Sequence, residues 1–108
     1  MDFEKLLTQS IQEHKYWQFN AEWCKDCKYS KRVYEKMNIP QDKIYFFEIS
    51  GYSKKEQSEC RAALKKIIGT GNLPSIMIDG KLWGTEKELH ELEDKGELQE
   101  EFVRIGLL

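Results

Sequence analysis

The chain has 108 residues and a mass of 12.8 kDa, a size that predicts one domain spanning residues 1–108. Its 17 basic and 19 acidic residues give a net charge of −2, so it lacks the basic excess that nucleic-acid binding requires. The longest run of aliphatic and aromatic residues is Ile44 to Phe47, whereas a membrane span needs about 20 apolar residues. The N-terminus is acidic and interrupted by charges, unlike a signal peptide. We therefore expect a cytoplasmic protein with no membrane or nucleic-acid partner.

The first half of the chain predicts two helices and two strands. Apolar residues recur at helical spacing over residues 2–14, which predicts an amphipathic helix. A short aromatic strand is expected over residues 16–19 and a helix over residues 24–37. Residues 44–49 form a dense apolar run, typical of a strand that is covered on both faces of its sheet.

The second half contains two capping boxes, in which side chains satisfy the free N–H groups at the start of a helix. They begin at Ser53 and at Thr85. In chain order, the expected elements are a helix over residues 53–68, strands over 75–78 and 81–83 joined by an Asp79-Gly80 turn, and helices over 85–95 and 98–105.

The order of all these elements is α-β-α-β-α-β-β-α-α. A β-α-β unit makes a parallel pair of strands through a right-handed crossover, and the hairpin adds two antiparallel strands. With helices on both faces of the sheet, we predict an α/β fold, a three-layer α/β/α sandwich around a four-stranded mixed sheet.

Three cysteines occur, Cys24, Cys27 and Cys60, and this odd, small number argues against the disulfide framework of a secreted protein. In a reducing compartment, the C-x-x-C spacing of the first two indicates redox chemistry or metal binding. Zinc takes four ligands, and the other strong candidates, Cys60, His14 and His90, have no paired spacing. Redox chemistry is therefore the preferred interpretation. Cys60 is in register with apolar helix residues and is expected in the core.

The predicted strand–helix junction places Cys24 at a helix N-terminus, where the helix dipole and free N–H groups favour a thiolate. Lys25 and Lys28 favour it further, whereas the carboxylate of Asp26 opposes it. Cys27 lies one turn further into the helix and is the natural resolving thiol, the group that attacks a mixed disulfide formed at Cys24.

The segment Ala21-Glu22-Trp23-Cys24, followed by Cys27-Lys28, resembles the active-site segment of thioredoxins. With Asp26 it has the form W-C-x-D-C, which is similar to thioredoxin-related proteins that carry an acid before the second cysteine. The C-terminal third is similar to glutaredoxins in the stretches Ile67 to Pro74, Ile76 to Lys81, Gly84 to Glu86 and Lys95 to Leu98. The resemblance covers about residues 15–105 and implies a thioredoxin-fold thiol–disulfide oxidoreductase that is glutaredoxin-like in its C-terminal part.

In that superfamily the proline before the hairpin is cis and faces the cysteines, and the resemblance gives this role to Pro74. Because Pro74 has no N–H group, the backbone of Leu73 is free to pair with an extended substrate. The resemblance also implies that the helix start at Thr85 and Glu86 receives glutathione. The candidate substrate-binding or glutathione-binding residues are Trp23, Lys25, Asp26, Leu73, Pro74, Thr85 and Glu86.

Three positions depart from the family patterns. Thioredoxins carry a buried acid that accepts a proton six residues before the first cysteine, and this position is Gln18. A proton acceptor would then have to be Asp26, if it faces the thiols, or water. Glutaredoxins carry a lysine where this chain has Ala21, and often a basic residue where it has Gly71. Both usual cationic contacts to glutathione are therefore missing.

The resulting hypothesis is an enzyme that reduces protein disulfides or glutathione mixed disulfides through Cys24 as nucleophile and Cys27 as resolving thiol. Glutathione or a flavoprotein reductase would restore the dithiol, no metal or organic cofactor is required, and a monomer is expected. Two other interpretations stay open. The chain could be a catalytically weak module that binds a partner peptide at Leu73-Pro74, or its C-x-x-C could hold a metal or iron–sulfur site shared between two chains.

Overall fold

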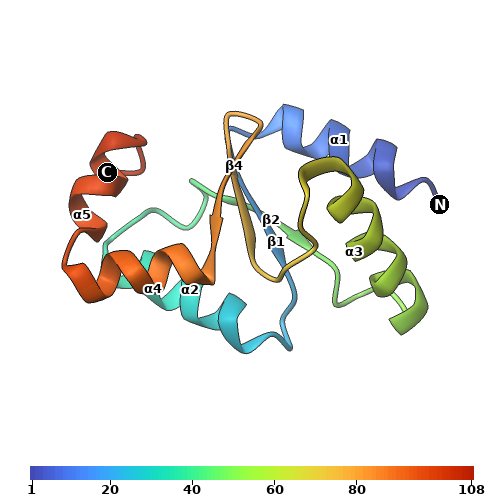
Figure 1. Ribbon diagram of the computed structural model, residues 1–108, viewed down its shortest axis with the longest axis horizontal. Coiled ribbons are helices and arrows are strands. Elements are labelled where there is room, and N and C mark those ends of the chain that lie inside the picture. The colour runs from blue at the N-terminus through green and yellow to red at the C-terminus, as the bar shows by residue number, and fades with distance from the viewer.

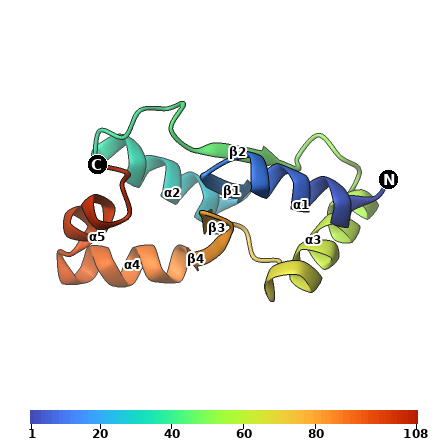
Figure 2. The ribbon, with the colours of Figure 1, turned by 90° about the horizontal axis from the view of Figure 1, so that it is seen from above.

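The computed structural model describes residues 1–108, which form five helices and four strands in three layers. In chain order the elements are α1 (Phe3–Glu13), β1 (Tyr16–Asn20), α2 (Lys25–Lys36), β2 (Tyr45–Glu48), α3 (Lys54–Ile68), β3 (Ser75–Ile78), β4 (Lys81–Thr85), α4 (Glu86–Lys95) and α5 (Leu98–Arg104). The sheet lies in the middle, with α1 and α3 on one side and α2, α4 and α5 on the other (Figures 1 and 2). The predicted three-layer α/β/α architecture is confirmed.

The four strands form one mixed sheet in the order β2-β1-β3-β4. β1 pairs with β2 in parallel and with β3 in antiparallel fashion, and β3 pairs antiparallel with β4. Asp79 and Gly80 join β3 to β4 with φ angles of 51° and 75°. Positive φ at both turn residues is the geometry of a tight hairpin turn, as Asp-Gly predicts.

The prediction that the apolar run over residues 44–49 is covered on both faces is wrong: β2 lies at the edge of the sheet, and only one of its four residues is buried. Tyr45 is 39% exposed, while Phe47 is buried. The aromatic rings on this edge are shielded by single side chains instead of a full layer. His14 stacks on Tyr45 with a centroid distance of 3.8 Å, and Lys31 lies over the ring of Phe46. A dense apolar run therefore does not distinguish a central strand from an aromatic edge strand.

Both capping boxes form as predicted, with Ser53 and Thr85 as the N-cap residues of α3 and α4. Each helix begins one residue later than the sequence predicted, because the cap residue itself has extended backbone angles. α3 and α4 end at Gly69 and Gly96, both in the left-handed region that glycine adopts without strain.

β1 lies between two apolar cores, one on each face of the sheet, and carries polar side chains toward one of them. Its five residues are all buried, and their side chains alternate between the two faces of the sheet. Trp17 and Phe19 pack in the core under α1 and α3. Gln18 and Asn20, which are also fully buried, face the side covered by α2. The central strand thus carries two buried polar side chains toward the start of α2.

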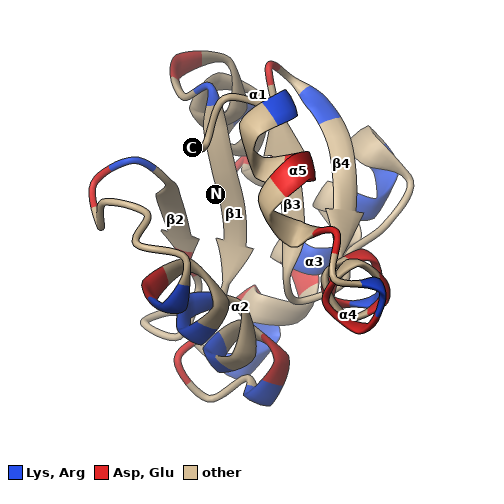
Figure 3. Cartoon of the chain, turned by 90° about the vertical axis from the view of Figure 1, so that its left-hand side faces the viewer, with Lys and Arg blue, Asp and Glu red and all other residues tan.

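The helices that face the viewer in Figure 3 carry both basic and acidic residues. This distribution agrees with the net charge of −2. None of the five helices combines the length and the apolar character needed to cross a bilayer.

Candidate active site

Cys24 is the N-cap residue of α2, and its sulfur takes the place that a serine or aspartate oxygen usually holds at a helix start. The Cys24 Sγ accepts a hydrogen bond from the backbone N–H of Cys27, with a separation of 3.4 Å. The same sulfur lies 3.4 Å from the carbonyl oxygen of Leu73, to which the thiol donates. The sulfur therefore lies between the free N–H groups of a helix and the backbone of the segment that precedes β3.

The three cysteines differ in exposure and in ease of ionisation. Cys24 is 8% exposed, Cys27 is 1% exposed and Cys60 is fully buried. Burial raises the pKa of Cys60 to about 11. Burial, followed by the negative charges of Cys24 and Glu48, holds the pKa of Cys27 well above its usual range. Cys27 and Cys60 are therefore thiols at neutral pH, and Cys24 is the thiol that a substrate reaches first. Its exposure is smaller than the sequence led us to expect.

The segment opposite Cys24 has the geometry that the family resemblance implied. The Leu73–Pro74 peptide bond is cis, and both residues are buried. Across the sheet, Ser75 pairs with Thr85, so the start of α4 lies beside the residue that follows Pro74. The structure thus brings Leu73, Pro74 and Thr85 to one end of the sheet, next to Cys24.

Glu86 is the first residue of α4, directly after the cap residue Thr85. Its Oε2 atom is buried and has no hydrogen-bond partner. A buried carboxylate oxygen without a partner is costly unless a ligand supplies a donor. Glu86 therefore has a carboxylate oxygen for which the protein itself supplies no donor.

Trp23 is 55% exposed beside Cys24, and its indole is fixed by α3. The indole Nε1 donates to Gln57 Oε1 at 3.1 Å. A hollow of about 310 Å³ opens at this contact, lined by Trp23, Lys54, Gln57, Ser58 and Arg61. The sequence reasoning missed these α3 residues. Their spacing of three, one and three residues defines one helical face, but a polar helical face is usually only solvated.

The surroundings of Gly71 explain why this position lacks the basic residue that the family pattern predicts there. A Cβ atom at position 71 would lie 2.5 Å from the carbonyl oxygen of Arg61. The side chain of Arg61 reaches back, and its Nε donates to the carbonyl oxygen of Gly71 at 3.0 Å. Position 71 therefore has no room for a basic side chain, and a guanidinium from α3 lies at the same place.

Gly71→Ala is expected to destabilise the protein by about 1–3 kcal/mol, because the added methyl group meets backbone that cannot move freely. In a domain of this size, each kcal/mol lowers the midpoint of thermal unfolding by about 4 °C. Gly51→Ala is the matched control, because a Cβ atom there meets nothing within 4 Å. Equal unfolding midpoints for the two variants would contradict the close contact at position 71.

Lys25 and Asp26 lie in the first turn of α2, but neither contacts a thiol through a hydrogen bond. Lys25 is exposed and Asp26 is half-buried. The carboxylate that raises the pKa of Cys27 is that of Glu48, at the end of β2. Asp26 is thus the carboxylate nearest to Cys27 in sequence, but Glu48 is the one that raises the pKa of Cys27. A charged residue inside a predicted buried strand was the signal for Glu48.

A C-x-x-C at the start of a helix, with an X-Pro segment opposite it on a mixed sheet, defines thiol–disulfide oxidoreductases of the thioredoxin fold. None of the protein-family models matches the chain. It is 45% identical over 106 residues to glutaredoxin-8 of Saccharomyces cerevisiae, covering 98% of this chain and 96% of that protein. It is 31% identical to glutaredoxin-1 of the same yeast, covering 89% of this chain and 86% of that protein.

Solved structures agree with the sequence comparison. The solution structure of the yeast dithiol glutaredoxin Grx8 matches with a TM-score of 0.87 and 43% identity, covering 98% of this chain and 96% of that one. A buckwheat glutaredoxin–glutathione complex matches in fold, with a TM-score of 0.71 and 18% identity over 98% of this chain and 92% of that one. The chain belongs to the glutaredoxin family and is a thiol–disulfide oxidoreductase.

No three or more histidine, cysteine, aspartate or glutamate side chains gather as a set of metal ligands.

Proposed function

We propose that the protein reduces disulfides by two successive exchanges at Cys24 and Cys27. The Cys24 thiolate attacks one sulfur of the substrate disulfide, that S–S bond breaks, and one substrate thiolate leaves and takes a proton from water. Cys27 then loses its proton to solvent and attacks the Cys24 sulfur. The second substrate thiol leaves, and a Cys24–Cys27 disulfide remains, so the substrate gains the two electrons that the dithiol loses.

The position of the Cys24 sulfur carries this assignment. A thiolate, not a thiol, is the nucleophile in disulfide exchange. Of the three sulfurs, only Cys24 is both partly exposed and hydrogen-bonded to a free N–H group of a helix N-terminus. The burial of Cys27 keeps it protonated until Cys24 has reacted. At that point Cys24 carries no negative charge, so one of the causes that raise the pKa of Cys27 is removed.

We further propose glutathione as the thiol that restores the dithiol. Glutathione is a tripeptide with two carboxylates and one ammonium group, so its recognition needs at least one cation and one anion. Arg61 supplies a guanidinium that is hydrogen-bonded to Gly71, two residues before Leu73. Glu86 supplies a buried, unpaired carboxylate oxygen at the start of α4. The glutathione complex of the buckwheat relative supports the same class of ligand.

Reduction of the oxidised protein tests this proposal directly. The Cys24–Cys27 disulfide is prepared, and its reduction is followed with increasing glutathione and, separately, with a flavoprotein thioredoxin reductase. Fast reduction by glutathione that saturates with concentration supports the proposal. Indifference to glutathione, together with fast reduction by the reductase, would assign the flavoprotein as the reductant instead.

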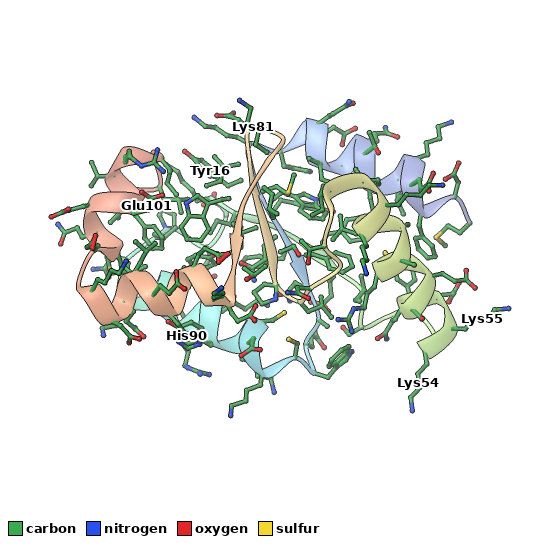
Figure 4. The ribbon with its side chains drawn as sticks, viewed as in Figure 1. Tyr16, Lys54, Lys55, Lys81, His90 and Glu101 are labelled. Carbon is green, nitrogen blue, oxygen red and sulfur yellow. The ribbon has the colours of Figure 1, made fainter.

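Arg61→Gln is expected to raise the KM for a glutathione mixed disulfide about tenfold, because a charge-assisted hydrogen bond is worth about 1.5–3 kcal/mol. Lys55→Gln is the matched control. It removes the same charge from α3, but Lys55 projects away from the fold into solvent (Figure 4). Steady-state kinetics with both variants give the result, and an equal KM for the two would exclude Arg61 as a glutathione contact.

A further inference from the structure

A continuous chain of buried hydrogen bonds runs behind the dithiol. The hydroxyl of Tyr34 donates to Gln18 Oε1 at 2.7 Å. Gln18 Nε2 donates to Asn20 Oδ1 at 3.2 Å, and Asn20 Nδ2 donates to Glu48 Oε1 at 2.6 Å. Every donor along this path points toward Glu48, so the path from α2 through β1 to β2 has one direction.

A branch of the same chain reaches the resolving cysteine. Gln18 Nε2 also donates to Ser30 Oγ at 2.7 Å, and Ser30 Oγ donates to the carbonyl oxygen of Cys27 at 2.7 Å. Ser30 and Gln18 are fully buried. The orientation of the Gln18 amide therefore decides whether the Ser30 hydroxyl points at the backbone of Cys27.

The other oxygen of Glu48 holds the turn that leads into α2. Glu48 Oε2 accepts hydrogen bonds from the backbone N–H of Glu22 at 2.9 Å and from the backbone N–H of Ser50 at 3.1 Å. The hydroxyl of Ser50 donates to the same oxygen. Partial burial works against the charge of Glu48, but the hydrogen bonds from Ser50, Asn20 and Glu22 hold the pKa of its carboxyl below the usual range. Glu48 is therefore an anion at neutral pH.

An anion at this place fixes the direction of the whole chain, because a carboxylate accepts hydrogen bonds and cannot donate them. If the amide of Asn20 were turned over, its Oδ1 would face the carboxylate and its Nδ2 would face Gln18 Nε2. Both contacts would then lack a partner of the opposite kind, and unsatisfied buried groups are costly. The charge of Glu48 thus orients Asn20, which in turn orients Gln18.

We propose that Glu48 is a positioning residue for disulfide exchange: it ties the Glu22 turn to β2 and, through Asn20, Gln18 and Ser30, orients the backbone of Cys27 for attack on the sulfur of Cys24. The carboxylate that thioredoxins carry at position 18 is thus replaced by a neutral amide, and an acid on the neighbouring strand directs that amide. This inference rests on the proposed roles of Cys24 and Cys27.

Two possible roles of Glu48, one through its charge and one through positioning, predict opposite effects of Glu48→Gln on the rate of attack by Cys27. The charge of Glu48 opposes ionisation of Cys27, so a role through charge alone predicts that Glu48→Gln speeds the attack by Cys27. A positioning role predicts that the attack slows. Asn20 and Glu22 donate to different oxygens of Glu48. The single oxygen of the amide in Glu48→Gln can take only one of these two places, so the other donor faces the new N–H₂ group.

The test follows the reaction of the reduced protein with the chromogenic disulfide dithiobis(nitrobenzoate). Attack by Cys24 releases one coloured thiolate and leaves a mixed disulfide on Cys24. Attack by Cys27 on the Cys24 sulfur then releases a second coloured thiolate and forms the Cys24–Cys27 disulfide. In Glu48→Gln we expect the second release to slow about tenfold and the first to change less than twofold. An unchanged or faster second release overturns the proposal.

A second substitution gives every contact of the chain a donor and an acceptor again, with the two roles exchanged between positions 20 and 48. In the double variant Asn20→Asp/Glu48→Gln, one oxygen of the new carboxylate accepts from Gln18 Nε2 and the other accepts from the new amide at position 48. The oxygen of that amide still accepts from the N–H of Glu22. The net charge and the number of hydrogen bonds are thereby kept, although the bond between positions 20 and 48 now runs in the opposite direction. We expect the double variant to regain most of the lost rate, whereas Asn20→Asp alone, with two carboxylates face to face, does not.

Control variants distinguish a positioning role of Glu48 from a general effect of charge and from a failure of the proposed cysteine roles. Glu91→Gln removes one charge from an exposed position of α4 and is expected to leave both releases unchanged. A folded double variant that reacts no faster than Glu48→Gln overturns the proposal. Failure of the proposed cysteine roles is distinguishable, because it shows as a first release that survives Cys24→Ser.

The direction of the chain is also measurable without any variant. In the nuclear Overhauser spectrum of the unmodified protein, the Asn20 Nδ2 protons should contact the Glu48 side chain, and the Gln18 Nε2 protons should contact Ser30. Contact of the Asn20 Nδ2 protons with the Gln18 side chain instead overturns the proposal even where the variants do not fold.

Discussion

Cys24→Ser is expected to remove disulfide reduction, with a loss of more than about a thousandfold. The serine hydroxyl keeps the N-cap hydrogen bond from Cys27 N–H, so α2 still begins at the same residue. What disappears is the only sulfur that is both partly exposed and in contact with the helix N-terminus. The measurement is the rate of reduction of an insulin-type protein disulfide and of a glutathione mixed disulfide under the same conditions.

Cys60→Ala is the matched control for the loss of a thiol. Cys60 is fully buried in the same core and lies on α3, and burial raises its pKa to about 11. Its removal is expected to cost about 1 kcal/mol of stability and to leave the rate unchanged. Full activity in Cys24→Ser would contradict the nucleophile assignment, and loss of activity in a folded Cys60→Ala variant would show that Cys60 takes part.

The elements that the sequence predicted well are those whose signals are local. A capping box needs only four consecutive residues, and both the Ser53 and the Thr85 boxes form. The Asp79-Gly80 turn needs only two residues that tolerate positive φ. The C-x-x-C at a strand–helix junction also combines neighbours in sequence. Its placement at the N-terminus of α2 therefore follows from the residues themselves.

Features that depend on which strands are neighbours could not be read from the chain in the same way. The position of β2 at the edge of the sheet depends on the strand order, which no single segment encodes. The absence of a basic residue at position 71 also depends on a contact between segments that are separate in sequence. Gly71 is required by the carbonyl of Arg61 on another element, and the guanidinium that lies there comes from that residue.

At position 18, where thioredoxins carry an acid, this chain has a glutamine, and an acid on the neighbouring strand accompanies it. From the sequence, an amide at this position means only that a proton acceptor is absent. In the structure, the amide is fully hydrogen-bonded and links Tyr34 and Ser30 to Asn20. The acid lies on the adjacent strand, at Glu48, because Asn20 and Glu48 are paired in the parallel β1–β2 register. Sequence reasoning looked for the acid beside the thiols in Asp26, while strand pairing places one at Glu48.

Cys27→Ser is expected to stop the reduction of protein disulfides at the mixed disulfide. Cys24 still attacks, because its sulfur and its contact with Leu73 are unchanged. The second exchange then lacks its intramolecular nucleophile, and an external thiol must replace it. Since a well-oriented intramolecular group is equivalent to a very high concentration of an external one, the rate should fall at least about a hundredfold. The trapped species is visible as a covalent adduct in mass spectra under non-reducing conditions.

The same variant separates the two substrate classes. In a glutathione mixed disulfide, attack by Cys24 leaves glutathione on Cys24, and a second glutathione thiolate can displace it without any help from Cys27. Activity toward that substrate should therefore persist in Cys27→Ser while activity toward protein disulfides is lost. If both activities fell together in a folded variant, Cys27 would be needed for the first attack. The proposed order of the two thiols would then have to be reversed, despite the burial that holds the pKa of Cys27 high.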